Sequence, residues 1–310
     1  MSTEEATQTT ATPSPVYVLF YNFWDGFAEQ TNSMDCTFFI TLLEKTFNAP
    51  IHITTCANTA TVLVESIFGT QTYLYYKKWD ATFLFTGESH YCDCQYTPLY
   101  DCVLGFEDTH EKYVKCPLYL LFLQTNPSIL REITGPAAAA AAAAADVIPP
   151  NHASVILTNI HGDERLKFIH RAELSMPVFF GGKYNNNVGG VVGGCYNSSE
   201  MSDFYKRRKF AITMENSDRP YYITEKLING LRSGVIPVYW GTSRVGEFFN
   251  PRRFLHLMSD ATQEDMDALI HRMKTMTDDE YVNIIREPIM TRSIEDVMDE
   301  ISQSIKKILT

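Results

Sequence analysis

The chain has 310 residues, of which 45% are hydrophobic, and this content is enough for the cores of two domains. Asp and Glu outnumber Lys and Arg by 37 to 26, and the net charge of −11 argues against binding of nucleic acid or of an anionic membrane surface by the protein as a whole. No apolar run approaches the roughly 18 residues of a membrane span, and the N-terminus lacks the pattern of a secretion signal. We therefore expect a soluble protein, cytoplasmic or peripheral to a membrane, in which any phosphate-bearing ligand meets a local cluster of positive side chains.

The cysteines favour reduced thiols over a disulfide framework, because there are seven of them in a long chain. His90, Cys92 and Cys94 form a cluster that could bind zinc. Their spacing differs from that of the common zinc ribbons and fingers, so ordinary thiols are the favoured interpretation.

The first third of the chain predicts an α/β domain. Residues 1–14, rich in Thr, Ala, Glu and Pro, are expected to be a disordered leader before a domain at 15–123. A helical pattern covers 36–47. The expected strands are 16–21, 51–55, 81–86 and 102–106.

A linker is expected at 124–151. Four prolines bracket nine consecutive alanines in this segment, at 137–145. Alanine is the best helix former, but a biased tract can also fill a poorly defined stretch, and the sequence leaves both possibilities open.

Residues 152–285 alternate strand and helix patterns, which predicts a parallel, Rossmann-like sheet. The expected strands are 154–159, 176–180, 209–214 and 235–240.

Helix starts in this half are marked by capping residues. Asp163, Thr224 and Thr262 are each expected to cap a helix, and Gly234 to end the second of these. A terminal amphipathic helix is expected within 286–310, where it could pack back on the first domain.

Two cations occupy unfavourable places in these helices. Arg165 and Lys226 each lie two positions after an expected N-cap, where the helix dipole disfavours a positive charge. Each could be an ordinary solvated side chain, but a bound anion would stabilise both, because helix N-termini at the carboxyl ends of parallel strands attract phosphates. We therefore expect a diphosphate site there, and expect replacement of either residue by Ala to leave folding intact.

Residues 210–241 read FAITMENSDRPYYITEKLINGLRSGVIPVYWG. This segment resembles the donor-binding motif of glycosyltransferase family 10, the α1,3-fucosyltransferases, in the order E-N-S, Y-I-T-E-K and P-V followed by Gly. A thinner likeness to bacterial members extends over residues 16 to about 260. It includes Arg165 and the triplet Thr86-Gly87-Glu88.

The resemblance implies the GT-B fold, an α/β architecture of two Rossmann-like domains that face each other across a cleft. The acceptor would bind mainly on the first domain and GDP-fucose on the second. The implied reaction is the inverting transfer of L-fucose from GDP-β-L-fucose to a hydroxyl of an oligosaccharide or glycoconjugate, with α1,3-linkage to a GlcNAc-type sugar.

The resemblance also implies roles for single residues. Glu88 would be the catalytic base, and Glu225 would offset the positive charge that develops on the fucose ring. Four residues would bind the donor: Arg165, Asn216, Tyr222 and Lys226. No metal cofactor is expected, because no D-x-D motif lies beside the donor segment and cationic side chains can take its place.

Two alternatives remain, namely a catalytically silent protein that binds glycans or nucleotide sugars, and a GT-B transferase with another donor. A silent protein is expected to have lost some of Glu88, Arg165, Glu225 and Lys226, and all four are present.

The glycine-rich run 185–195 lacks the Lys-Ser/Thr ending of a P-loop and is expected to be a loop. The basic run 206–209 is expected to be a solvated edge.

Overall fold

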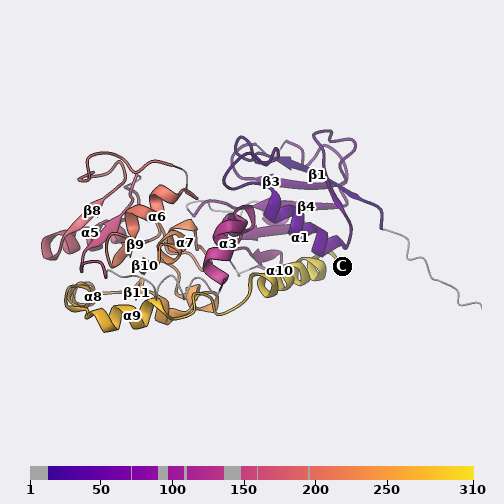
Figure 1. Cartoon of the computed structure of the whole chain (residues 1–310). Coiled ribbons are helices and arrows are strands. Elements are labelled where there is room, and N and C mark those ends of the chain that lie inside the picture. The colour runs from indigo at the N-terminus through magenta and orange to yellow at the C-terminus, as the bar shows by residue number, and fades with distance from the viewer. Residues whose placement is uncertain are drawn as a thin grey trace, which may run out of the picture.

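The computed structural model describes residues 13–70, 72–89, 97–107, 110–135, 148–158, 160–194 and 196–310. Two parallel β-sheets lie side by side, each with its own helices (Figure 1). The predicted α/β architecture is confirmed. Most of the expected leader, the alanine tract and the cluster of His90, Cys92 and Cys94 lie outside the described residues.

The first sheet has six strands in the order β2-β1-β3-β4-β5-β6, all parallel. The four strands predicted in this half are present. Two more, β3 and β6, were not predicted, since β6 has three residues and β3 carries a buried glutamate that breaks the apolar pattern. The strands are β1 (Val16–Tyr21), β2 (Ile51–Ile53), β3 (Val62–Ser66), β4 (Ala81–Phe85), β5 (Cys102–Gly105) and β6 (Tyr113–Lys115).

The second sheet has five parallel strands in the order β11-β10-β9-β7-β8. Its inner strands are buried along their whole length, as expected of a sheet that is covered on both faces. The strands are β7 (Ala153–Val155), β8 (Val178–Phe180), β9 (Phe210–Ile212), β10 (Ile236–Trp240) and β11 (Leu255–Leu257).

Helices flank both sheets (Figure 1). In the first half they are α1 (Thr37–Phe47), α2 (Leu118–Thr125) and α3 (Pro127–Thr134), with a 3-10 turn η1 (Thr97–Leu99). In the second half they are α5 (Asp163–Ser175), α6 (Ser199–Tyr205), α7 (Glu225–Arg232), α8 (Gln263–Thr275), α9 (Asp278–Ile285) and α10 (Ile294–Leu309), with 3-10 turns η2 (Ser243–Glu247) and η3 (Pro251–Arg253).

The predicted capping residues are correct at two of the three helix starts. Thr224 caps α7, and Thr262 forms a capping box at α8. The prediction for Asp163 is wrong by one position, because the cap is Gly162 with a φ of 100°. A Cβ at Gly162 would lie 3.0 Å from the carbonyl oxygen of Asn216, so glycine permits α5 to begin against the donor segment.

The last helix returns to the first sheet. Figure 1 shows α10 beside α1, and Lys45 of α1 lies 2.8 Å from Asp299 of α10. Ile301 and Ile305 of α10 are buried in the core that they share with α1. The chain therefore crosses from the second half back to the first.

Part of the expected linker at 124–151 is packed. Its residues 127–134 form α3, in which Ile129 and Ile133 are buried. The limits of the domains given above stay predictions.

The basic run 206–209 is not simply a solvated edge. Lys209 is 2% exposed, and its ammonium lies 2.6 Å from Asp278. Arg208 stacks its guanidinium on the ring of Phe179, 3.9 Å from the centroid. The expectation of a solvated edge is therefore wrong for Arg208 and Lys209, which directly precede β9 and pack against neighbouring elements.

Across the described part of the chain, no helix combines the length and the apolar character that crossing a bilayer needs.

Glu65 gives the first sheet a pH-dependent element. Its side chain is fully buried, its carboxylate accepts a hydrogen bond of 2.6 Å from Tyr100, and burial raises its pKa. A carboxyl group with a raised pKa in the folded state stabilises that state at acid pH, and this contribution is lost as the pH rises through the folded pKa.

We predict that Glu65→Gln becomes increasingly stable relative to the parent as the pH rises above about 4.5, the ordinary range of a Glu pKa. The amide keeps an oxygen for Tyr100 but does not ionise. Urea unfolding of both proteins over a pH series measures the difference. A difference that stays constant with pH would contradict the prediction.

Candidate functional site

A cavity of about 380 Å³ lies where the carboxyl ends of the two sheets meet. One wall is apolar and comes from the first half of the chain: Trp24, Met34, Phe68, Leu118 and Leu121. The cavity is also lined by all six residues singled out in the sequence: Glu88, Arg165, Asn216, Tyr222, Glu225 and Lys226. The structure thus brings together residues that are up to 138 positions apart, and their roles stay predictions.

A larger cavity, of about 890 Å³, lies between α3 and the connection from α9 to α10. It shares no lining residue with the first cavity. Volume therefore does not locate the candidate site, whereas the convergence of charged side chains does.

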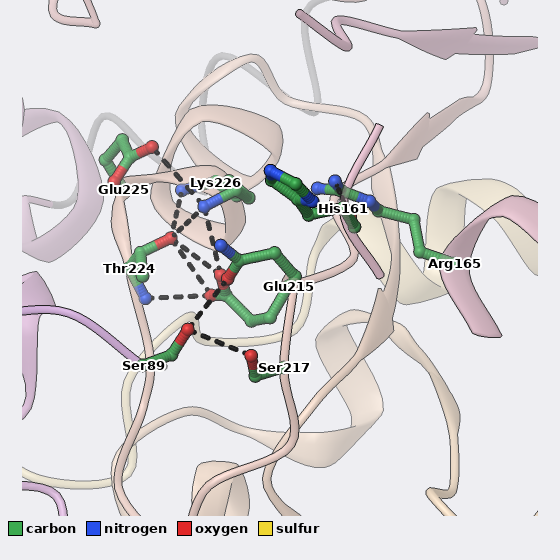
Figure 2. Close-up of polar contacts among 9 residues, drawn as sticks. Ser89, His161, Arg165, Glu215, Ser217, Thr224, Glu225 and Lys226 are labelled. Carbon is green, nitrogen blue, oxygen red and sulfur yellow. Dashed lines mark hydrogen bonds and ion pairs between the residues drawn. The ribbon is translucent and has the colours of Figure 1, made fainter. Parts of the chain in front are cut away.

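Glu215 is at the centre of the polar wall (Figure 2). Its side chain is fully buried just after β9. The backbone N–H of Thr224 donates to its Oε1 at 2.8 Å, and the ammonium of Lys226 donates to its Oε2 at 3.1 Å. The hydroxyl of Thr224 is also within 2.8 Å of Oε2. Glu215 thereby joins the end of one strand to the start of α7.

The charges of this cluster are coupled. Burial by itself would lower the pKa of Lys226, but the carboxylates of Glu215 and Glu225 outweigh it and hold that pKa above its ordinary value. Burial raises the pKa of Glu215, whereas Lys226 and the donors of Thr224 oppose this. A carboxylate that accepts from a backbone N–H, a hydroxyl and an ammonium is well suited to stay ionised.

The position of Lys226 in the helix therefore does not by itself require a bound anion, and its role toward a diphosphate stays a prediction. The protein itself places an anion, the carboxylate of Glu215, beside the ammonium at the start of α7. Glu215 belongs to the same sequence motif as the capping Thr224, nine positions before it, and this proximity in sequence was the one available indication of the contact. Its burial could not be deduced from the motif.

Arg165 lies at the third residue of α5 and is 4% exposed. Its guanidinium donates to the carbonyl oxygen of His161 (Figure 2). Burial lowers the pKa of Arg165, and the carboxylate of Glu215 counteracts this shift. Guanidinium groups remain charged in proteins, so Arg165 brings a second positive charge to the cavity.

One carboxylate reaches the cavity from each half of the chain. Glu225 is the first residue of α7, and its carboxylate lies 3.7 Å from the ammonium of Lys226. Glu88 follows Gly87 after β4 and is half-buried. Acidic side chains from the two sheets are thus available on the two sides of one cavity.

The donor segment is docked on the first half of the chain. The hydroxyls of Ser89 and Ser217 are 2.9 Å apart, and the N–H of Tyr119 donates to the carbonyl of Ile223 at 2.9 Å. The ring of Tyr222 packs edge-on against Phe106, with centroids 5.0 Å apart. The sequence missed these contacts, because only the tertiary structure brings the segments together.

No group of three or more metal-ligating side chains occurs among the residues with a described position. The cluster of His90, Cys92 and Cys94 is outside them.

Comparison with known proteins identifies the second half. Residues 152–284 match the sequence model of glycosyltransferase family 10 (fucosyltransferase), C-terminal part. The α1,3-fucosyltransferase FucT of Helicobacter pylori is 26% identical over 185 residues, which are 51% of this chain and 37% of that protein. A bovine 4-α-L-fucosyltransferase, FUT3, is 38% identical over 69 residues, 21% of this chain and 19% of that protein. The matched part thus spans less than half of these relatives.

Solved structures agree with the architecture. A crystal structure of an α1,3-fucosyltransferase with GDP is 20% identical, covers 99% of this chain and 94% of its own, and has a TM-score of 0.72. A structure titled as that enzyme with GDP-fucose has a TM-score of 0.70 over the same coverage. These structural matches confirm the predicted GT-B fold, and the sequence matches above confirm the resemblance to family 10.

We predict that Lys226→Met destabilises the protein by on the order of 2–4 kcal/mol, because it leaves the buried carboxylate of Glu215 without its cation. This prediction replaces the earlier expectation that substitution of Lys226 leaves folding intact. Combining Lys226→Met with Glu215→Gln restores much of the loss, because the amide carries no charge. Urea unfolding measures both variants.

The matched control is Lys167→Met, which removes a lysine from an exposed ion pair with Glu164 and is expected to change stability little. A Lys226→Met protein as stable as the parent would show that Glu215 is not held by this contact.

Proposed function

Because residues 152–284 match the C-terminal part of glycosyltransferase family 10 (fucosyltransferase), we propose that the chain transfers L-fucose from GDP-β-L-fucose to a hydroxyl of a glycan acceptor. The observation that carries the proposal is a single cavity with two cations and a carboxylate on one wall and a second carboxylate, Glu88, on the other. The acceptor is an oligosaccharide or glycoconjugate, and the linkage is α1,3 to a GlcNAc-type sugar.

The polar wall binds the donor in this proposal. Arg165 and Lys226 neutralise the diphosphate, together with the positive end of the α7 dipole. Asn216 and Tyr222 hydrogen-bond to the donor. Glu215 acts indirectly, because it fixes the ammonium of Lys226 and the first turn of α7. These cations make a bridging metal unnecessary.

The reaction is a single displacement. The carboxylate of Glu88 takes the proton of the acceptor hydroxyl, and the oxygen attacks C1 of fucose from the face opposite the phosphate. The bond from C1 to the phosphate oxygen breaks, and its electron pair leaves with GDP. Glu225 offsets the positive charge on the sugar ring in the transition state. Attack from the opposite face inverts the anomeric centre.

The apolar wall supports a sugar as the acceptor. The indole N–H of Trp24 donates to the carbonyl of Met34 at 2.8 Å, which fixes the ring. Phe68 packs edge-on against Trp24, with centroids 5.8 Å apart, and is 49% exposed. Rigid aromatic surfaces beside the base suit the C–H face of a pyranose ring.

We predict transfer of label from GDP-fucose to at least one member of a panel of GlcNAc-containing glycans, in the presence and absence of a chelator. GDP-mannose and UDP-sugars serve as control donors. Loss of all activity in chelator, reversed by metal, would overturn the metal-independent mechanism and direct attention to His90, Cys92 and Cys94. Binding of GDP-fucose without transfer to any glycan would favour a silent binding protein.

Glu88→Gln is predicted to lower the transfer rate by on the order of 10²- to 10⁴-fold, the usual effect of removing a general base. Affinity for GDP, measured by calorimetry, should be unchanged, because Glu88 is assigned to the acceptor hydroxyl and the proposed diphosphate ligands are Arg165 and Lys226. The control is Glu44→Gln, at an exposed position of α1. A Glu88→Gln enzyme that turns over like the parent would remove Glu88 from this role.

A further inference from the structure

Arg219 connects the donor segment with the other half of the chain. It lies between β9 and α7, in the part of the motif whose residue types the family resemblance leaves open. Its Nε donates to Oε1 of Glu107 at 2.8 Å, and its Nη1 donates to the carbonyl oxygen of Ser89 at 2.7 Å. One planar guanidinium thus contacts the loops that follow β5 and β4.

Ser89 is the residue directly after Glu88. It is 2% exposed, and its hydroxyl lies 2.9 Å from the hydroxyl of Ser217 and 3.4 Å from Oδ1 of Asn216. Both its carbonyl and its side chain are therefore held by residues of the donor segment. The backbone that carries the proposed base is fixed to the wall that binds the donor.

The ion pair is suited to this task by its burial and by its geometry. The side chains of Arg219 and Glu107 are 26% and 20% exposed, so solvent screens them less than a surface pair. The guanidinium fork can serve a carboxylate and a carbonyl at the same time, whereas a lysine ammonium lacks this fixed arrangement. Phe106, the neighbour of Glu107, packs on Tyr222 of the donor segment, which adds a second contact between the same two parts of the chain.

Arg219 is not among the residues that line the cavity. Any influence on the reaction is therefore indirect, and Ser89 and Glu107 offer a route for it. A general base acts only when its carboxylate is within hydrogen-bond distance of the proton, and small displacements of such a group lower the rate strongly.

We propose that Arg219 is a positioning residue, which sets the distance between the base Glu88 and the donor by joining Ser89 and Glu107 to the donor segment. The proposal rests on the fucosyltransferase function proposed above. It assigns this chain a contact between its two halves that the donor motif does not specify.

The experiment compares Arg219→Ala and Arg219→Lys with Arg272→Ala. Arg272 is the matched control, because its guanidinium makes two contacts with Glu280, at 2.9 and 3.0 Å, entirely within the second half of the chain. Two readouts are needed, namely steady-state transfer from GDP-fucose and amide hydrogen exchange of peptides that cover 86–89 and 216–222.

We expect Arg219→Ala to lower kcat by about 10- to 100-fold with little change in GDP affinity. It should also speed exchange in both peptides. Arg219→Lys should fall between Arg219→Ala and the parent in both readouts, and Arg272→Ala should match the parent in both. If Arg219→Ala does not fold, Arg219→Lys decides by the same criteria.

Faster exchange with an unchanged kcat would overturn the positioning role and leave a purely structural contact. Unchanged exchange in both peptides would overturn the contact itself. If the parent transfers no sugar from GDP-fucose, the proposed function fails, while the exchange measurement still tests whether Arg219 holds the two segments together.

Discussion

The buried carboxylate of Glu215 is the constraint on which the candidate site depends. A charged group without solvent is tolerated only where donors surround it, and here Thr224 and Lys226 supply them. Satisfying this one carboxylate fixes the cap of α7, the orientation of the Lys226 side chain and the path of the segment after β9. Arg165 adds a second cation at the start of another helix. The polar wall is thus organised without a ligand, and such preorganisation would lower the cost of binding the diphosphate proposed above.

The two parallel sheets explain how this wall and the carboxylate of Glu88 come to line one cavity. In each sheet the loops at the carboxyl ends of the strands carry the polar residues. Glu88 follows β4 in one sheet, and Glu215 follows β9 in the other. Packing the sheets with these ends together places the proposed base Glu88 and the proposed donor wall on one cavity, and α10 adds a further contact between the two halves by returning to α1.

Much of this could be predicted from the sequence, because strands, helix caps and the donor motif are local patterns. Thr224 and Thr262 were recognisable as caps from their neighbours alone, and the resemblance to family 10 indicated six residues that line one cavity. The predictions that failed concern features that depend on residues distant in the sequence. The start of α5 was misplaced because Gly162 owes its role to the nearby backbone of Asn216, and the anion beside Lys226 is a residue of the chain itself. Burial of Glu65 and Lys209 likewise comes from tertiary packing.

The two walls of the cavity differ in a way that bears on specificity. The donor wall is built from coupled charges, in which a change at Glu215, Thr224 or Lys226 disturbs the others. The opposite wall consists of apolar side chains whose contacts are independent of that network, with Phe68 half exposed at its edge. Substitutions there alter shape without leaving a buried charge unsatisfied. A fold of this kind can therefore keep one donor while its acceptor surface varies, provided that the contacts around Ser89 hold the two walls at a fixed distance.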